Sequence, residues 1–192
     1  MPTLEAQKTA TAEGIALSIA QFRERIESRR RRAWLPDPGK TVLERRKHWQ
    51  DMAAQRAQRI EAGEYIGDEL LPQLRDDRAM NALGREFLKA AERGNAPMVG
   101  AFIEEGFPTN YQDRQSEETA LHISAAVHAR KVLRVLIESG LCNYLLRDKG
   151  GRLASELAYL FGHDPAVARL LGIKECKQAE AQGITLTRRP QL

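Results

Sequence analysis

The sequence predicts an all-α protein whose central part is a stack of repeated helical hairpins. Apolar residues recur there at a constant offset of 34 positions, and they form three columns. The columns are Val99, Leu133 and Val167; Phe102, Leu136 and Leu170; and Ile103, Ile137 and Leu171. A period of this length is typical of stacked helical hairpins, because a single hairpin cannot bury its apolar face without a neighbour.

A separate helical module is expected before the repeats, over residues 1–78. Ile15, Ile19, Phe22 and Ile26 recur at helical spacing, which predicts an amphipathic helix that ends near Arg32. This apolar stripe could cap the repeat stack, form the seam of a dimer or bind a partner helix. A cap is favoured, because a stack of three units needs its end face covered.

A second helix is expected in the same module. A Pro-rich segment from Trp34 to Gly39 ends the first helix. Thr41 and Glu44 then have the spacing of a capping box, so the second helix is expected to start there and to continue to about Gly63.

The basic residues of the chain are concentrated in this module. The whole chain has a formal net charge of +4, whereas the range from Arg23 to Arg59 holds twelve Lys or Arg against five acidic residues. Such a surface could attract nucleic acid, an anionic membrane or an acidic protein. The favoured interpretation is a solvated face with local ion pairs, such as Glu27 with Arg31. The candidate anion-binding residues are Arg29, Arg30, Arg31, Arg32, Arg45, Arg46 and Lys47.

The turn inside the repeated hairpin also recurs. Residues 94–99 read Gly-Asn-Ala-Pro-Met-Val, and residues 162–167 read Gly-His-Asp-Pro-Ala-Val. The two prolines stand near the first turn of a second helix, where a missing N–H costs nothing. Gly106 and Gly140 follow that helix at the place where a left-handed glycine commonly ends it.

The middle unit identifies a family resemblance. Residues 119–126 read Thr-Ala-Leu-His-Ile-Ser-Ala-Ala, which resembles the Thr-Pro-Leu-His-x-Ala-Ala core of the ankyrin repeat. The resemblance covers residues 80–171, as units of about 80–113, 114–147 and 148–172, and the outer two units are more degenerate. The expected domain is therefore 79–172, an ankyrin-like helical repeat solenoid. The resemblance implies that His122 ties adjacent loops by hydrogen bonds and is neither catalytic nor a metal ligand.

The resemblance also implies where a partner would bind. In ankyrin-like stacks the concave surface is built from loop tips and from exposed positions on the first helix of each unit. Carried over by register, these positions are Glu92, Arg93, Ala126, Val127, Leu160 and Phe161 on helices, and Arg114, Gln115, Glu118, Lys149 and Arg152 at tips. An apolar floor with a charged rim suits a peptide or helix of a protein partner. Equally, the chain could cover the patch itself, through Ile15, Phe22 and Trp34 or through its tail.

Residues 173–192 are expected to form a capping helix and a flexible tail. Gly172 follows Leu171 directly, so the helix of the third unit is expected to end there and a new helix to begin at Ile173 and end at Gly183. This terminal helix would cover the last unit.

No catalytic, metal or cofactor motif is present in the sequence. Cys142 and Cys176 lack a second cysteine or histidine at metal-ligand spacing, and Trp34 stands where a phosphate-binding loop ending at Thr41 would need glycine. No stretch is long enough to span a bilayer and no signal-peptide pattern opens the chain, so a cytoplasmic location is expected. The expected function is a non-enzymatic adaptor that binds a protein. The alternative is binding of nucleic acid or an anionic surface by the Arg-rich module.

Overall fold

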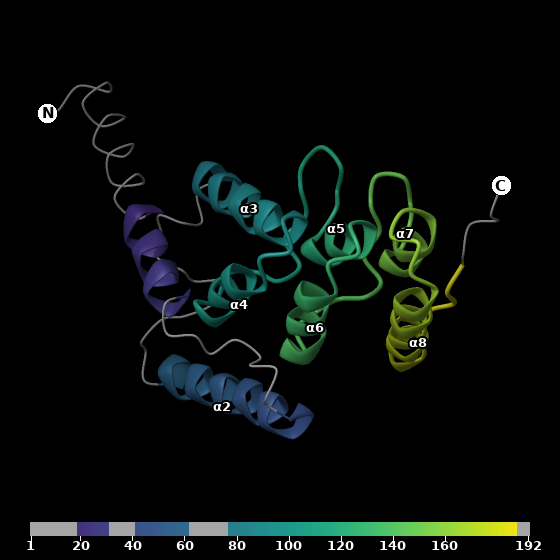
Figure 1. The fold of residues 1–192 in the computed structure, drawn as a ribbon. Coiled ribbons are helices and arrows are strands. Elements are labelled where there is room, and N and C mark those ends of the chain that lie inside the picture. The colour runs from purple at the N-terminus through teal and green to yellow at the C-terminus, as the bar shows by residue number, and fades with distance from the viewer. Residues whose placement is uncertain (1–18, 31–40, 62–76, 188–192) are drawn as a thin grey trace, which may run out of the picture.

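The computed structural model describes residues 19–30, 41–61 and 77–187, and the described residues form helices and no strand (Figure 1). The all-α class is therefore confirmed for this part of the chain. None of the described helices is both long enough and apolar enough to cross a bilayer. The helices are a segment over residues 19–30, α2 (Val42–Glu61), α3 (Asp77–Glu92), α4 (Ala96–Glu104), α5 (Ala120–Ala126), α6 (Arg130–Ser139), α7 (Ala154–Leu160) and α8 (Pro165–Gln182).

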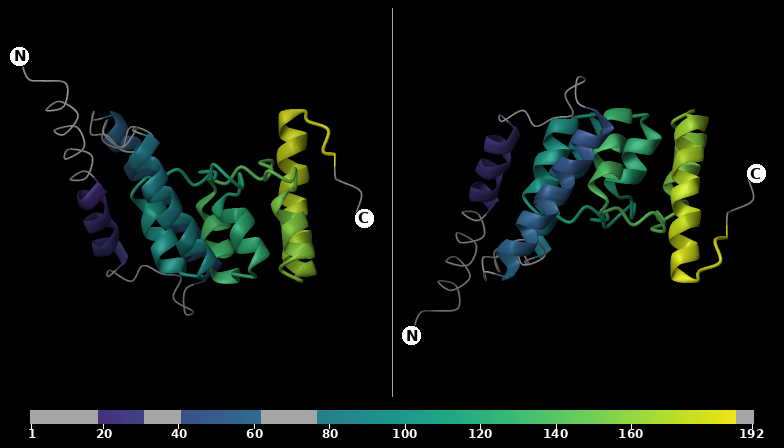
Figure 2. Two further views of the ribbon diagram at one scale, coloured as in Figure 1. Left: turned by 90° about the horizontal axis from the view of Figure 1, so that it is seen from above. Right: turned by 90° about the horizontal axis from the view of Figure 1, so that it is seen from below.

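From α3 onward the helices form three consecutive hairpins. The helices α3, α5 and α7 pack against one another in one layer, and α4 and α6 pack in a second layer that continues into α8. Two long loops, residues 105–119 and 140–153, join the hairpins and lie at the same edge of the row (Figure 1). Helix 19–30 lies at one end of this row and α8 at the other (Figure 2).

The first helices of the three hairpins end at the offset of 34, at Glu92, Ala126 and Leu160, and the starts of the second helices follow it with one exception. The helices α4 and α6 begin 34 residues apart, at Ala96 and Arg130, whereas α8 begins at Pro165, one residue later than the offset requires. The extra residue lies in the turn between α7 and α8, where the Asp164 N–H reaches back to the Ala158 carbonyl at 3.0 Å. Two of the apolar columns keep their buried positions nonetheless, because Val167 packs against the core and Leu171 is buried, whereas Leu170 of the remaining column is 45% exposed.

The predicted helix ends are observed. Thr41 N–H donates to Glu44 Oε2 at 2.6 Å and Glu44 N–H donates to Thr41 Oγ1 at 3.3 Å, which is a capping box. Gly140 ends α6 in the left-handed region, with φ 71°. Both α4 and α8 carry a proline in their first turn.

The core runs continuously through the hairpins and into the amino-terminal module. Phe87, Phe102 and Phe107 form an aromatic cluster with ring centroids 5.1–5.5 Å apart. Phe22 of helix 19–30 joins this cluster at 5.9 Å from the Phe102 ring, and Ile26 is buried beside it. The interpretation of the apolar stripe as a cap is thus confirmed for these two residues, whereas Ile15 and Trp34 lie outside the described residues.

The expected separate helix from Ile173 is a wrong prediction. The helix α8 continues through Gly172 without interruption and ends at Gly183, which is left-handed with φ 66°. Leu171, Glu175 and Ala179 recur on one buried face of α8, and α8 packs along α7. A glycine inside a helix costs about 1 kcal/mol. Burial of this face outweighs that cost, so the helix continues.

Candidate protein-binding surface

The two long loops are joined to each other and to α8 by hydrogen bonds. Asn110 Oδ1 accepts from the Asn143 N–H at 2.7 Å, and the Lys149 N–H donates to the Ser116 carbonyl at 2.8 Å. In α8, Gln178 Oε1 accepts from the Tyr144 N–H at 2.7 Å. Because their backbone groups are satisfied by neighbours, the loops form a fixed edge beside the first helices of the hairpins.

His122 is part of this bonding and not of a reactive site. Its ring is buried, with Nδ1 2.8 Å from Thr119 Oγ1 and Nε2 3.3 Å from the Arg152 carbonyl oxygen. Burial lowers the pKa of His122, so the ring is neutral at neutral pH. The link to the Arg152 carbonyl joins α5 to the following loop, as the resemblance implies.

Three large apolar side chains lie exposed at the carboxyl ends of α5 and α7. Val127, Leu160 and Phe161 are 46%, 44% and 54% exposed, and we call them the apolar patch. Gly162 brings the two helix ends together, since a Cβ at that position would lie 2.3 Å from the Ala125 carbonyl oxygen. Only glycine permits this approach, and it places Phe161 and Val127 on neighbouring helix ends. The exposure expected for these residues is therefore observed.

Arg152 lies over the patch, held by a carboxylate that sequence reasoning missed. Its guanidinium carbon is 5.2 Å from the centre of the Phe161 ring, and Arg152 Nη2 is 2.6 Å from Asp148 Oδ2. Burial raises the pKa of Asp148, but hydrogen bonds from Arg152 outweigh this effect and the net pKa is lowered. Asp148 therefore stays ionised and orients Arg152 above an aromatic face, a favourable arrangement for a cation.

The other predicted positions lie around the patch and the loop edge. Ala126 is half-buried beside Val127, and Glu92 and Arg93 are exposed at the end of α3. At the loops, Arg114, Gln115 and Lys149 are exposed and Glu118 is half-buried.

The basic residues of the amino-terminal module are largely used inside the molecule. Arg29 pairs with Glu105, and Arg45 Nε lies 2.9 Å from Glu138 Oε1. Arg46 and Lys47 are exposed, whereas Arg31 and Arg32 lie outside the described residues.

The expected pattern of local ion pairs is largely wrong. Arg30 does pair locally, with Glu27 at 2.8 Å, but Arg25 reaches Glu105 at 2.6 Å and Arg23 pairs with Glu86. These partners belong to the hairpins and lie far away in the sequence. These longer-range ion pairs therefore attach the amino-terminal module to the hairpins.

Glu104 is the most buried acceptor of these pairs. It is 7% exposed, and His48 Nε2 lies 2.7 Å and Arg29 Nη1 3.6 Å from its carboxylate oxygens. Nothing in the sequence pattern singled this residue out, because its partners come from two other helices. A buried carboxylate needs such partners, since burial without them is unfavourable.

Within the described residues, no group of His, Cys, Asp or Glu side chains could hold a metal ion. Cys142 is no candidate nucleophile, because burial raises the pKa of its thiol to about 12. No protein-family model and no curated protein matches this chain.

Proposed function

We propose that residues 79–172 form an ankyrin-like repeat scaffold, and that the protein is a non-enzymatic adaptor that binds a protein partner. Three observations support the scaffold: the helical hairpins at an offset of 34, the hydrogen-bonded loop edge, and the position of His122 between two loops. The observation that carries the binding proposal is the apolar patch with Arg152 above it.

The patch is unusual for a surface that faces only water. Val127, Leu160 and Phe161 are large, about half exposed and located at the neighbouring ends of α5 and α7, and exposed apolar patches commonly mark interaction sites. The patch combines an aromatic ring with an arginine stacked on it, and protein interfaces are enriched in aromatic residues and arginine. The proposed partner inserts apolar side chains here and contacts the loop edge with polar ones.

The described residues do not cover the patch with another part of the chain. Phe22 is buried in the aromatic cluster with Phe102 and Phe107 instead. The described tail runs to Thr187, where its carbonyl accepts from Arg147 Nη2 at 2.5 Å. Both observations favour an external partner over the self-covering alternative.

The alternative function, binding of an anion by the Arg-rich module, receives less support. Arg29 and Arg45 are paired with glutamates of the hairpins, so binding a phosphate would first break these pairs. A protein that uses such residues for phosphate contacts would lose affinity steeply as salt rises. Binding of duplex DNA with a steep salt dependence, lost on substitution of Arg46 and Lys47, would support this alternative.

The patch is tested by partner capture with two double variants. We expect Leu160→Ser with Phe161→Ser to lose the proteins that the full-length wild type captures from its native lysate at high salt. The control is Leu170→Ser with Ile184→Ser, which changes two apolar residues of similar exposure outside the patch. The control should retain capture, and circular dichroism should show equal helical content in all three proteins. Unchanged capture by the patch variant would contradict the proposal.

A further inference from the structure

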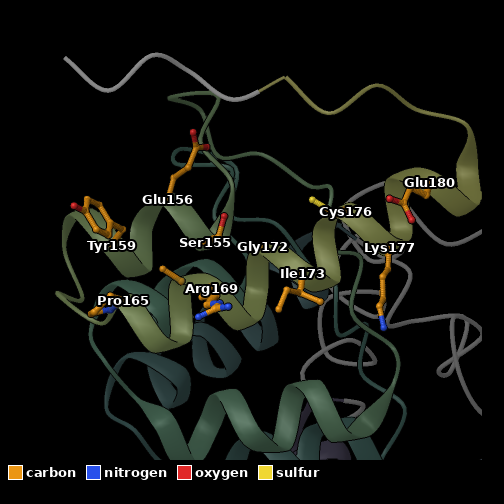
Figure 3. Close-up of a pocket in the computed structure, with 11 residues that line it drawn as sticks. Ser155, Glu156, Tyr159, Pro165, Arg169, Gly172, Ile173, Cys176, Lys177 and Glu180 are labelled. Carbon is orange, nitrogen blue, oxygen red and sulfur yellow. The ribbon is translucent and has the colours of Figure 1, made fainter.

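The carboxyl-terminal end of the row carries an open groove between α7 and α8. The groove has a volume of about 640 Å³ and is shown in Figure 3. Two of its larger apolar side chains, Tyr159 of α7 and Ile173 of α8, are 51% and 48% exposed. The first and second hairpins each pack the equivalent face against the hairpin that follows. On the third hairpin, no described residue covers the face that carries the groove.

The α8 side of the groove has an ordered charge pattern. Arg169, Ile173, Cys176 and Glu180 recur along one side of α8, at spacings of four, three and four residues, and all four are exposed (Figure 3). This spacing is that of a helix–helix seam. The seam is basic at its amino-terminal end, acidic at its carboxyl-terminal end and uncharged between them.

We propose that this face binds a second copy of the chain, with the two α8 helices antiparallel across a two-fold axis. Antiparallel pairing places Arg169 of each copy beside Glu180 of the other, and Ile173 beside Cys176. Parallel pairing would instead oppose like charges at both ends. A two-fold interface requires a surface that is complementary to itself, and the reversed charge order of this seam meets that requirement.

The rest of the groove is compatible with close approach of a second copy. Glu156 and Lys177 also line it, so the groove has two acidic and two basic residues and two copies carry no net repulsion. Gly172 also lines the groove, between Arg169 and Cys176, and it places no side chain there. The described tail does not fill this space, because Thr187 is bonded to Arg147 at the loop edge.

The interface is small, so the dimer is expected to be weak and dependent on concentration. Two exposed apolar residues and two symmetry-related ion pairs fall at the low end of protein interfaces. The proposal is independent of the proposed function, because Val127, Leu160 and Phe161 of the apolar patch do not line the groove.

Sedimentation equilibrium of the full chain, over about a hundredfold range of concentration, tests the dimer. We expect Arg169→Glu and Glu180→Arg, each alone, to weaken dimerisation by at least about tenfold, since each creates two pairs of like charges. The double variant Arg169→Glu with Glu180→Arg should restore the affinity of the wild type. Lys131→Glu is the control, because it makes the same charge change as Arg169→Glu at an exposed residue of α6 that does not line the groove.

Three results would overturn the proposal. They are a monomer at every concentration, a double variant that is as weak as the single ones, and a loss in Lys131→Glu equal to that in Arg169→Glu. A monomer would leave the face to another protein or to solvent. Because the single variants leave the apolar patch intact, partner capture should persist in them, which separates a failure of the dimer from a failure of the proposed function.

Discussion

At the amino-terminal end of the row of hairpins, helix 19–30 buries Phe22 and Ile26 against the core, whereas at the carboxyl-terminal end Tyr159 and Ile173 stay half exposed. The first end is closed by aromatic packing and by ion pairs that cross between helices. At the second end, α8 accepts hydrogen bonds from polar groups of α7 and of the loop before it, but apolar side chains stay exposed. Another helix of the chain thus covers the apolar face at the amino-terminal end, whereas apolar side chains at the carboxyl-terminal end stay exposed, as the proposed dimer requires.

The carboxyl-terminal end satisfies its backbone through α8. Glu175 is fully buried, and its two carboxylate oxygens accept from Ser155 N–H at 3.0 Å and Ser155 Oγ at 2.6 Å. The side-chain oxygen of Gln178 likewise accepts a hydrogen bond from the Tyr144 N–H. The part of α8 beyond Leu171 therefore supplies hydrogen-bond acceptors to the first turn of α7 and to the loop before it.

The largest expected effect is at the closed end. Phe22→Ala should reduce the free energy of unfolding by about 3–5 kcal/mol, because it removes a fully buried ring from an aromatic cluster and leaves a cavity. Tyr159→Ala, at the open end, should change it by about 0.5 kcal/mol or less. Urea unfolding followed by circular dichroism measures both. Equal losses would show that the two ends do not differ as described.

Glu175 tests the polar closure of the open end. Glu175→Ala should cost about 1–3 kcal/mol of unfolding free energy, because it leaves a buried N–H and a buried hydroxyl of Ser155 without their acceptor. Exposed Glu180→Ala is the matched control and should cost about 0.5 kcal/mol or less. Thermal or urea unfolding at low protein concentration is the measurement. If both variants unfold alike, α8 does not close this end through Glu175.

Ion pairs made by the amino-terminal module should differ in strength with their burial. Arg45 and Glu138 are 12% and 18% exposed, whereas Arg30 and Glu27 are 42% and 36% exposed. A double-mutant cycle with alanine should give a coupling of about 1 kcal/mol for the first pair and about 0.3 kcal/mol for the second. High salt should reduce the second coupling more. A stronger coupling in the exposed pair would contradict attachment of the module by its buried pairs.

The smallest expected effect comes from the caps of the second helices at the two ends. Asn95 caps α4 and accepts from the Met98 N–H at 3.2 Å, whereas Asp164 caps α8 and also pairs with Arg130 and His128. The hydrogen bond from Arg130 lowers the pKa of Asp164 below its ordinary value. The resulting stability is present above that ordinary pKa and is lost as the pH falls through the lower pKa of the folded state.

Asp164→Asn should therefore lose about 0.5–1 kcal/mol at neutral pH and lose less at acid pH, where wild-type Asp164 is protonated as well. Unfolding free energies measured across the acidic range reveal the difference. The amide cap Asn95 does not titrate, so Asn95→Ser should give the same change at every pH. A loss in Asp164→Asn that grows as the pH falls would contradict this sign.

Much of the helical arrangement could be predicted from the sequence, because the information is local. The offset of 34 in the apolar columns predicts hairpins, and the spacing of Thr41 and Glu44 predicts the start of α2. The exposure of Val127, Leu160 and Phe161 follows from their register alone. That these residues bind a partner, and the boundaries of the domains, stay predictions.

The tertiary structure decided the features that depend on residues far apart in the chain. Arg29 reaches Glu105 and not a neighbour on its own helix, because the packing of Phe22 and Ile26 places helix 19–30 beside α4. The continuation of α8 through Gly172 depends on burial against α7, which no local pattern shows. Helix periodicity and capping act within a few residues, so the sequence determined them by itself. Ion-pair partners and buried faces depend on which helices meet, and folding alone settles that.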